Sequence, residues 1–214
     1  MEKSQSIYRL PLYGFIVAVM SLLSGCIYLH MTHLSDKDLE WTNSIPMYSG
    51  IILKSNNGRI VSVRYQKKFI NNSTDRFYIS AVGGTNYEAN AGYRFEIKDS
   101  LKTLSGFFSI ERPIKEKDLW YMASLGARFT IEEKDFVRPL VIRSYTIGNH
   151  IINDCVITDS SNSEYGSDLA NYPYYLIEKF VISKEYGLIY YKREDGEEFF
   201  REDLLPDSVV HGNK

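Results

Sequence analysis

The chain has 214 residues and a formal net charge of -2, a length that fits one folded domain with an appendage. Hydrophobic residues make up 44% and charged residues 24%, which excludes a chain that is disordered throughout. The nearly neutral charge lacks the basic excess of a nucleic-acid binder, so we expect no nucleic-acid partner. Two cysteines cannot build a disulfide scaffold or a four-thiolate zinc site. The 17 Tyr, 11 Phe and 2 Trp favour β-strands.

The N-terminus has the layout of a secretory signal. Lys3 and Arg9 precede an uncharged apolar run, 10–23, of the length that the hydrophobic region of a signal peptide uses. Leu23-Ser24-Gly25-Cys26 follows, and in this place it resembles a bacterial lipobox, the cleavage and lipidation site of lipoprotein signal peptides. The resemblance implies that the Cys26 thiol receives a diacylglyceryl group, that the chain is cut before Cys26, and that the freed α-amino group is acylated.

Two other interpretations of the N-terminus stay open. Residues 10–29 span about 20 positions, enough for an uncleaved transmembrane anchor helix, although Pro11, Gly14 and Gly25 interrupt them. An ordinary signal peptide that releases a soluble protein would need an A-x-A-like cleavage site, which this sequence does not have. The lipoprotein interpretation divides the chain into a signal peptide (1–25), a lipidated tether (26–46) and an antiparallel β domain (47–214).

The tether carries two local patterns. Ser35 and Asp38 have the spacing of a capping box and predict a short helical turn, with a solvated spacer as the alternative. His30 and His33 would share a face and hold a metal if this segment were helical, but a spacer without a ligand role explains them as well. We therefore expect no metal and no cofactor.

From Met47 onward, apolar and polar residues alternate as they do in strands with one buried and one wet face. A first hairpin is predicted at 50–54 and 59–65, because Asn57-Gly58 between them accepts the positive φ of a tight turn. Pro113 to Met122 is the best helix candidate, with Pro113 at the first helical position. Further strands are predicted at 93–98, 105–111, 127–132, 140–147 and 151–158.

The C-terminal part reads as a meander of strands at 175–183, 188–193 and 198–201, with turns at 184–187 and Asp195-Gly196. Before it, 159–174 is expected to be a polar surface loop, whose carboxylates do not match the EF-hand calcium spacing. Short turns and missing crossover helices predict an all-β, mainly antiparallel single domain, either an open or half barrel or a sandwich.

Four segments carry a second resemblance together with the lipobox: Asp38–Trp41 of the tether, and Gly148–Val156, Lys184–Tyr191 and Asp195–Glu197 of the β domain. They resemble envelope lipoproteins of Bacteroidota, which implies an antiparallel sheet and no assigned activity. Half-barrel lipid-carrier lipoproteins end similarly, which is an analogy of fold only. Proteins of this group carry O-glycans at Asp-[Ser/Thr]-apolar sequences, so Ser100 and Ser208 are candidate glycosylation sites.

The chain has no G-x-S-x-G, H-E-x-x-H, P-loop or G-x-G-x-x-G motif, and we expect no enzyme. Cys155 lies in an apolar run and is expected to be a buried, inert thiol, with a reactive thiol as the alternative. We expect a non-enzymatic binding or scaffolding lipoprotein, held on the membrane through Cys26, with an envelope protein, glycan or lipid as its partner. The alternatives are a periplasmic carrier of a lipid or hydrophobic ligand and an envelope hydrolase whose site is dispersed in sequence.

Residues after the lipidated cysteine bear on sorting. Enteric bacteria retain lipoproteins in the inner membrane when Asp follows that cysteine, whereas here Ile27 follows Cys26, which implies the outer membrane. Surface export in Bacteroidota tends to use acidic residues directly after the cysteine, and these are absent from 27–29. The periplasmic face of the outer membrane is therefore favoured over the cell surface.

Overall fold

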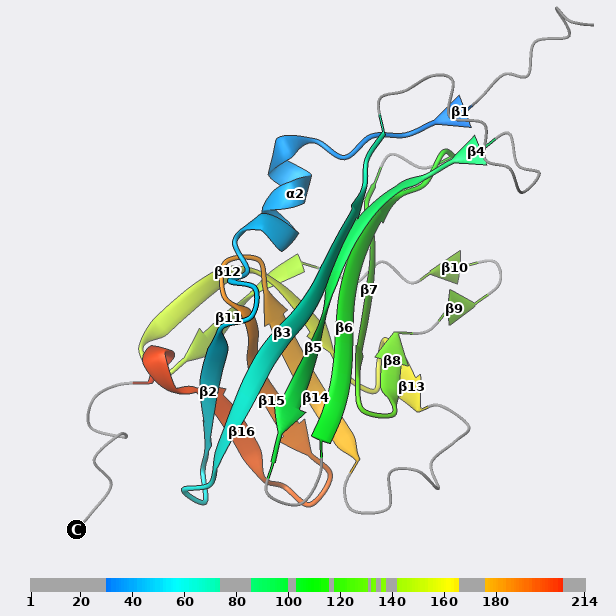
Figure 1. Cartoon of the computed structure of the whole chain (residues 1–214). Helices are drawn as coiled ribbons and strands as arrows, with labels where there is room; N and C mark the ends of the chain where they lie inside the picture. The colour runs from blue at the N-terminus through cyan, green and yellow to red at the C-terminus, as the bar shows by residue number, and fades with distance from the viewer. Residues whose placement is uncertain are drawn as a thin grey trace, which may run out of the picture.

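A computed structural model describes residues 30–73, 86–99, 103–115, 118–130, 132–133, 136–137, 142–165 and 176–205. Twelve strands of this part form one antiparallel sheet, which confirms the all-β class (Figure 1). In order across the sheet they are β11 (Ile142–Ile147), β12 (His150–Thr158), β14 (Ile177–Ser183), β15 (Gly187–Arg193), β16 (Glu198–Arg201), β2 (Gly50–Ser55), β3 (Ile60–Asn71), β5 (Ala89–Lys98), β6 (Thr103–Arg112), β7 (Trp120–Leu125), β8 (Arg128–Thr130) and β13 (Ser163–Tyr165).

The smaller elements lie around this sheet. Strand β1 (His30–Met31) pairs in parallel with β4 (Asn86–Tyr87), and β9 (Glu132–Glu133) pairs with β10 (Phe136–Val137). Helix α2 (Asp36–Asn43) lies against the sheet, and a short 3-10 helix, η2 (Glu202–Leu204), follows β16.

The main sheet is open, with β11 and β13 at its two ends, and it curls on itself. Buried side chains of β3, β5 and β6 belong to the same core as those of β14, β15 and β16, so the two halves of the sheet enclose one interior. A sandwich would need two separate large sheets. The open-barrel form of the expectation therefore describes this part of the chain.

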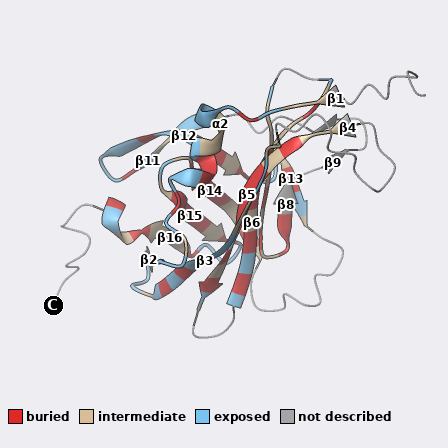
Figure 2. Ribbon diagram, turned by 45° about the horizontal axis from the view of Figure 1, so that its top comes forward, coloured by how far each residue is buried: buried red, intermediate tan, exposed pale blue. Residues whose placement is uncertain are grey.

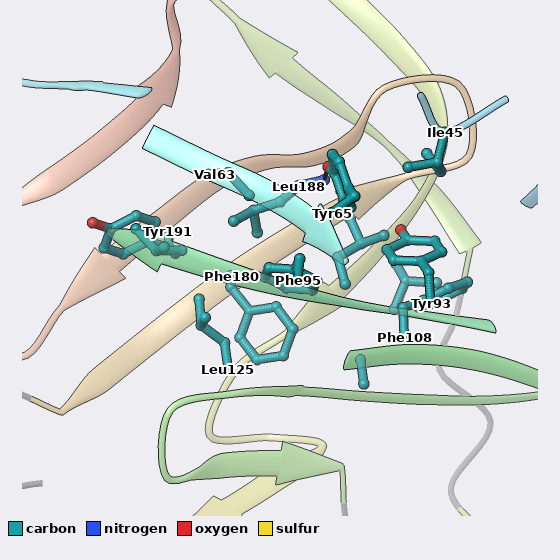
Figure 3. Packing of buried hydrophobic residues seen from close by; sticks show 14 of the residues in the cluster. Ile45, Val63, Tyr65, Tyr93, Phe95, Phe108, Leu125, Phe180, Leu188 and Tyr191 are labelled. Carbon is teal, nitrogen blue, oxygen red and sulfur yellow. Dashed lines mark hydrogen bonds between the residues drawn. The ribbon is translucent and has the colours of Figure 1, made fainter. Parts of the chain in front are cut away.

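Aromatic side chains fill that interior (Figure 3). Tyr65, Tyr93, Phe95 and Phe108 are fully buried, and the rings of Tyr65 and Tyr93 lie 5.4 Å apart, edge to face. Tyr93 continues the contact to Phe108 at 5.5 Å, and Trp41 of α2 reaches the same ring at 5.3 Å. Such pairs add about 0.5–1.5 kcal/mol each beyond the area they bury.

Two glycines make room for these rings. A Cβ at Gly106 would lie within 2.4 Å of the Phe95 ring, and one at Gly187 would lie 2.1 Å from the Tyr65 hydroxyl oxygen. Gly187 also has a φ of +73°, a conformation that side chains rarely adopt. The predicted turn at 184–187 therefore needs glycine both for its backbone and for the core beneath it.

The capping-box expectation is confirmed in helix α2. The Ser35 hydroxyl oxygen accepts from the Asp38 N–H, and the Asp38 carboxylate accepts from the Ser35 N–H at 2.8 Å. Leu34, Trp41 and Ile45 are buried in the main core. Residues 34–45 thus belong to the folded body and are not a solvated spacer.

The predicted helix from Pro113 to Met122 is wrong. Trp120–Leu125 forms β7, whose residues alternate between half-buried and buried, and Met122 pairs with Ser109 of β6. The period-two pattern and the long neighbouring strand β6 outweigh the favourable position of Pro113, which comes directly after the last residue of β6.

The predicted loop at 159–174 is wrong in part. Ser163–Tyr165 forms β13, which pairs with β8, whereas 159–162 is a turn. The rest of that stretch, from 166, lies outside the described residues. The predicted hairpins at Gly58, Gly148, Gly187 and Gly196 are confirmed, each with its glycine at positive φ. The β11–β12 hairpin is largely exposed (Figure 2).

Candidate functional site

The residues to which the sequence assigns modification lie mostly outside the described part of the chain. Cys26 and the rest of the lipobox precede His30, and the candidate glycosylation sites Ser100 and Ser208 also fall in undescribed stretches. Asp99, beside Ser100, is described, and its carboxylate pairs with Arg59. A candidate site must therefore be built from other residues.

A pocket of about 340 Å³, lined by polar and charged residues, lies where helix α2, strand β12 and the β14–β15 turn meet. The six residues that line it are Glu40, Ser44, Asn153, Asp154, Lys184 and Glu185. Three of the four segments that carry the resemblance to Bacteroidota lipoproteins contribute to this lining, although they are far apart in sequence. Local sequence patterns predict a helical turn, strands and tight turns in these segments, and they predict no site there.

The backbone at this pocket has an unusual conformation. Asp154 has a φ of 52°, in the left-handed region where Asp and Asn are the most frequent residues after Gly. Its carbonyl oxygen accepts from the Lys184 N–H at 3.0 Å, and regular pairing of β12 with β14 begins one residue later, at Cys155 with Ser183. Asp154, at this irregular position of β12, is thus one of the residues that line the pocket.

The electrostatics of the pocket are set by three carboxylates and one ammonium group. Lys184 Nζ lies 2.6 Å from Glu40 Oε2, and the Ser44 hydroxyl donates to the Glu40 carbonyl oxygen at 2.7 Å. The Lys184–Glu40 pair ties the helix to the turn and neutralises one carboxylate. Asp154 and Glu185 then leave the pocket net negative, which favours a partner that presents a cationic or hydrogen-bond-donating group.

A second charged cluster lies beside the β2–β3 and β15–β16 turns. Glu197 Oε2 accepts from Arg59 Nη1 at 2.8 Å and from Arg193 Nη1 at 2.7 Å, and Arg59 also pairs with Asp99. The carboxylates of Asp99 and Glu197 are only 3% and 5% exposed. This network joins three turns of the fold, and we assign it a structural role because its groups pair with one another.

Cys155 has the properties of a core thiol. It is free and buried, and its Sγ lies 3.4 Å from the Ile152 carbonyl oxygen, to which it donates. Burial raises the pKa of the thiol to about 11, so the nucleophilic thiolate is scarce at neutral pH. The expectation of a buried thiol is confirmed.

The candidate metal ligands are not brought together. His30 lies in strand β1 and His33 in the segment before α2, so the helix that would align them does not form there. In the described ranges, no group of three or more His, Cys, Asp or Glu side chains is placed to hold a metal ion. Of the carboxylates in the predicted loop at 159–174, that of Asp159 accepts from the N–H and hydroxyl of Ser161, and that of Asp168 lies outside the described residues.

No family model, no curated protein and no solved structure is similar to this chain. In the part of the chain that the structure describes, no helix combines the length and the apolar character needed to cross a bilayer.

Proposed function

We propose that this protein is a lipid-anchored, non-enzymatic binding or scaffolding protein of the bacterial cell envelope. One observation carries the proposal: Lys3 and Arg9, the apolar run 10–23 and Leu23-Ser24-Gly25-Cys26 occur in the order and spacing of a lipoprotein signal. Ile27 after Cys26 supports the outer membrane, and the lack of acidic residues at 27–29 supports its periplasmic face.

The binding part of the proposal rests on the pocket of α2, β12 and the β14–β15 turn. Its volume of about 340 Å³ lies in the range of pockets that take a small ligand or a partner's side chain, and its lining residues include Asp154 and Glu185. A carrier of a hydrophobic ligand would instead need apolar space inside the curled sheet, and aromatic side chains occupy that interior in the described residues. We therefore favour binding at the polar surface over transport inside the sheet.

The anchor is tested by labelling bacteria with radioactive palmitate. Cys26→Ala should abolish the label and leave an unprocessed precursor, because the thiol and the cleavage site are lost. Cys155→Ala is the matched control, since it also removes one cysteine, a buried one, and should keep the label. Label that persists in Cys26→Ala contradicts the proposed anchor.

The pocket is tested with a short oligolysine peptide as probe, by titration calorimetry. Neutralising the pocket with Asp154→Asn and Glu185→Gln should weaken binding, and Asn retains the left-handed backbone of position 154. The control double variant, Asp118→Asn with Glu164→Gln, makes the same change of charge at exposed positions that do not line the pocket. Equal weakening in both variants would mean that only net charge matters, and would reject the pocket.

A further inference from the structure

The first residue that the structure describes, His30, lies only four positions after Cys26, and it is already bound to the folded body. His30 pairs with Asn86 and Met31 with Tyr87, and the Thr32 N–H donates to the Tyr87 carbonyl oxygen at 2.9 Å. These pairs place β1 beside β4 at one end of the long strands (Figure 1).

Side chains fasten the same segment on both sides. The Thr32 hydroxyl oxygen accepts from the Ala89 N–H at 2.9 Å, and its hydrogen is donated to the Arg112 carbonyl oxygen. Asn72 then brackets Leu34: its amide oxygen accepts from the Leu34 N–H and its amide nitrogen donates to the Leu34 carbonyl oxygen, both at 2.9 Å. Residues 30–34 therefore bind to the end of β3, the start of β5 and the end of β6, and we call this segment the clamp.

A chain clamped this early has little reach. Four residues span at most about 14 Å when fully extended. Strand β3, with 12 residues, extends roughly 40 Å from the clamp toward the opposite end of the sheet. A lipid on Cys26 can thus bring the clamp end to a membrane but leaves the opposite end, with Asn57 and Asp195, well away from it.

We propose that the clamp end of the sheet lies against the membrane surface, with phospholipid headgroups as its partner. The clamp end consists of β1, β4, Lys67–Asn72 and Arg112–Lys115. This proposal rests on the lipidation of Cys26 put forward above. The body then has a fixed orientation, and its β2–β3 and β15–β16 turns point away from the bilayer.

The side chains at the clamp end suit headgroups better than hydrocarbon. Lys67 and Lys115 are exposed, and the Asn71 amide donates to the Asn90 amide oxygen at 2.9 Å. Ile70 is 41% exposed, and Asn71 follows it in β3. Charged and amide groups are costly to bury in hydrocarbon but interact well with the polar headgroup layer.

The test uses the acylated protein in vesicles of phosphatidylethanolamine and phosphatidylglycerol with a nitroxide quencher on a fraction of the headgroups. With Cys155→Ala as background, a fluorophore is attached at Ile70→Cys or, at the opposite end, at Asn57→Cys. We expect the Ile70 probe to be quenched several-fold more strongly than the Asn57 probe. Lys115→Cys provides a second clamp-end position should Ile70→Cys fail to fold.

A variant with twelve Gly and Ser residues inserted between Leu29 and His30 is the control for the short reach, and it should abolish the difference between the probes. Equal quenching of both probes in the acylated protein overturns this inference but leaves the proposed anchor standing. A difference in quenching that persists in the insertion variant shows that the short reach does not set the orientation, and it overturns the inference in the same way. The mass of the same preparation reports acylation independently, and a missing acyl group overturns the anchor and this inference together.

Discussion

At the scale of single residues, two buried tyrosines show that similar side chains can contribute differently to the stability of the fold. The Tyr65 hydroxyl oxygen accepts from the Leu188 N–H at 2.9 Å, whereas the Tyr93 hydroxyl is buried and has no hydrogen-bond partner among the described residues. Both rings lie in the same aromatic core, 5.4 Å apart. Burial raises the pKa of Tyr65 to about 12 and that of Tyr93 well above its ordinary value, so both stay neutral at physiological pH.

Tyr65→Phe should lower the free energy of unfolding by about 1–3 kcal/mol, because the buried Leu188 N–H loses its acceptor. Tyr93→Phe is the matched control and should be neutral or stabilising, since it removes a buried polar group that makes no hydrogen bond within the described part of the chain. Urea denaturation at neutral pH measures both. A larger loss for Tyr93→Phe than for Tyr65→Phe would show that the hydrogen-bond assignment is wrong.

Sequence patterns predicted many buried residues correctly, because alternation in a strand assigns each side chain to one face. Tyr93, Phe95 and Ile97 are fully buried as their period-two pattern predicts. The pocket could not be predicted from such patterns, because the positive φ of Asp154 and its hydrogen bond to Lys184 depend on the packing of three distant segments. Local patterns carry no information about such contacts.

At the scale of elements, helix α2 shows how a short helix is held in place. Asp38 accepts from the Ser35 N–H and hydroxyl at 2.8 Å, and from Arg112 Nη2 of β6 at 2.8 Å. Burial opposes the charge on Asp38, but these hydrogen bonds and the nearby guanidinium outweigh it and lower the pKa of the carboxyl below its ordinary 3.8. The charged form is therefore the one that stabilises the helix on the sheet.

A lowered pKa in the folded state gives stability that is present above the ordinary value of 3.8 and lost as the pH falls through the lowered value. Asp38→Asn should therefore destabilise the protein by about 1 kcal/mol at neutral pH. The difference from the unmodified protein should shrink as the pH falls through the lowered pKa of Asp38, because the carboxyl then becomes protonated. Denaturation curves measured from neutral to strongly acidic pH test this, and a difference of constant size would contradict it.

The wrongly predicted helix from Pro113 to Met122 shows what determines whether a segment forms a helix or a strand. Pro113 to Met122 has a good helical first residue but weak helical periodicity, whereas Trp120–Leu125 alternates in burial and pairs with β6. The free energy of that pairing comes from a neighbouring strand, which a short window of sequence cannot show. The capping box of α2 was predictable because all its groups lie within four residues.

At the scale of the whole molecule, the all-β class followed from turn chemistry and alternation, but the curl of the sheet did not. The curl brings β3, β5 and β6 to face β14, β15 and β16 across one aromatic core. The excess of Tyr and Phe in the sequence thus serves the interior of a single curled sheet. The same architecture gathers the pocket at one surface and clamps residues 30–34 at one end.

The proposed lipid at Cys26 is tested most directly by the mass of the N-terminal peptide of the mature protein. After proteolysis of protein purified from bacterial membranes, we expect a peptide that begins at Cys26 and is heavier than its amino acids by a diacylglyceryl group, with or without a further acyl chain. A peptide that begins at Met1, or one that carries Cys26 with a free thiol, would contradict it.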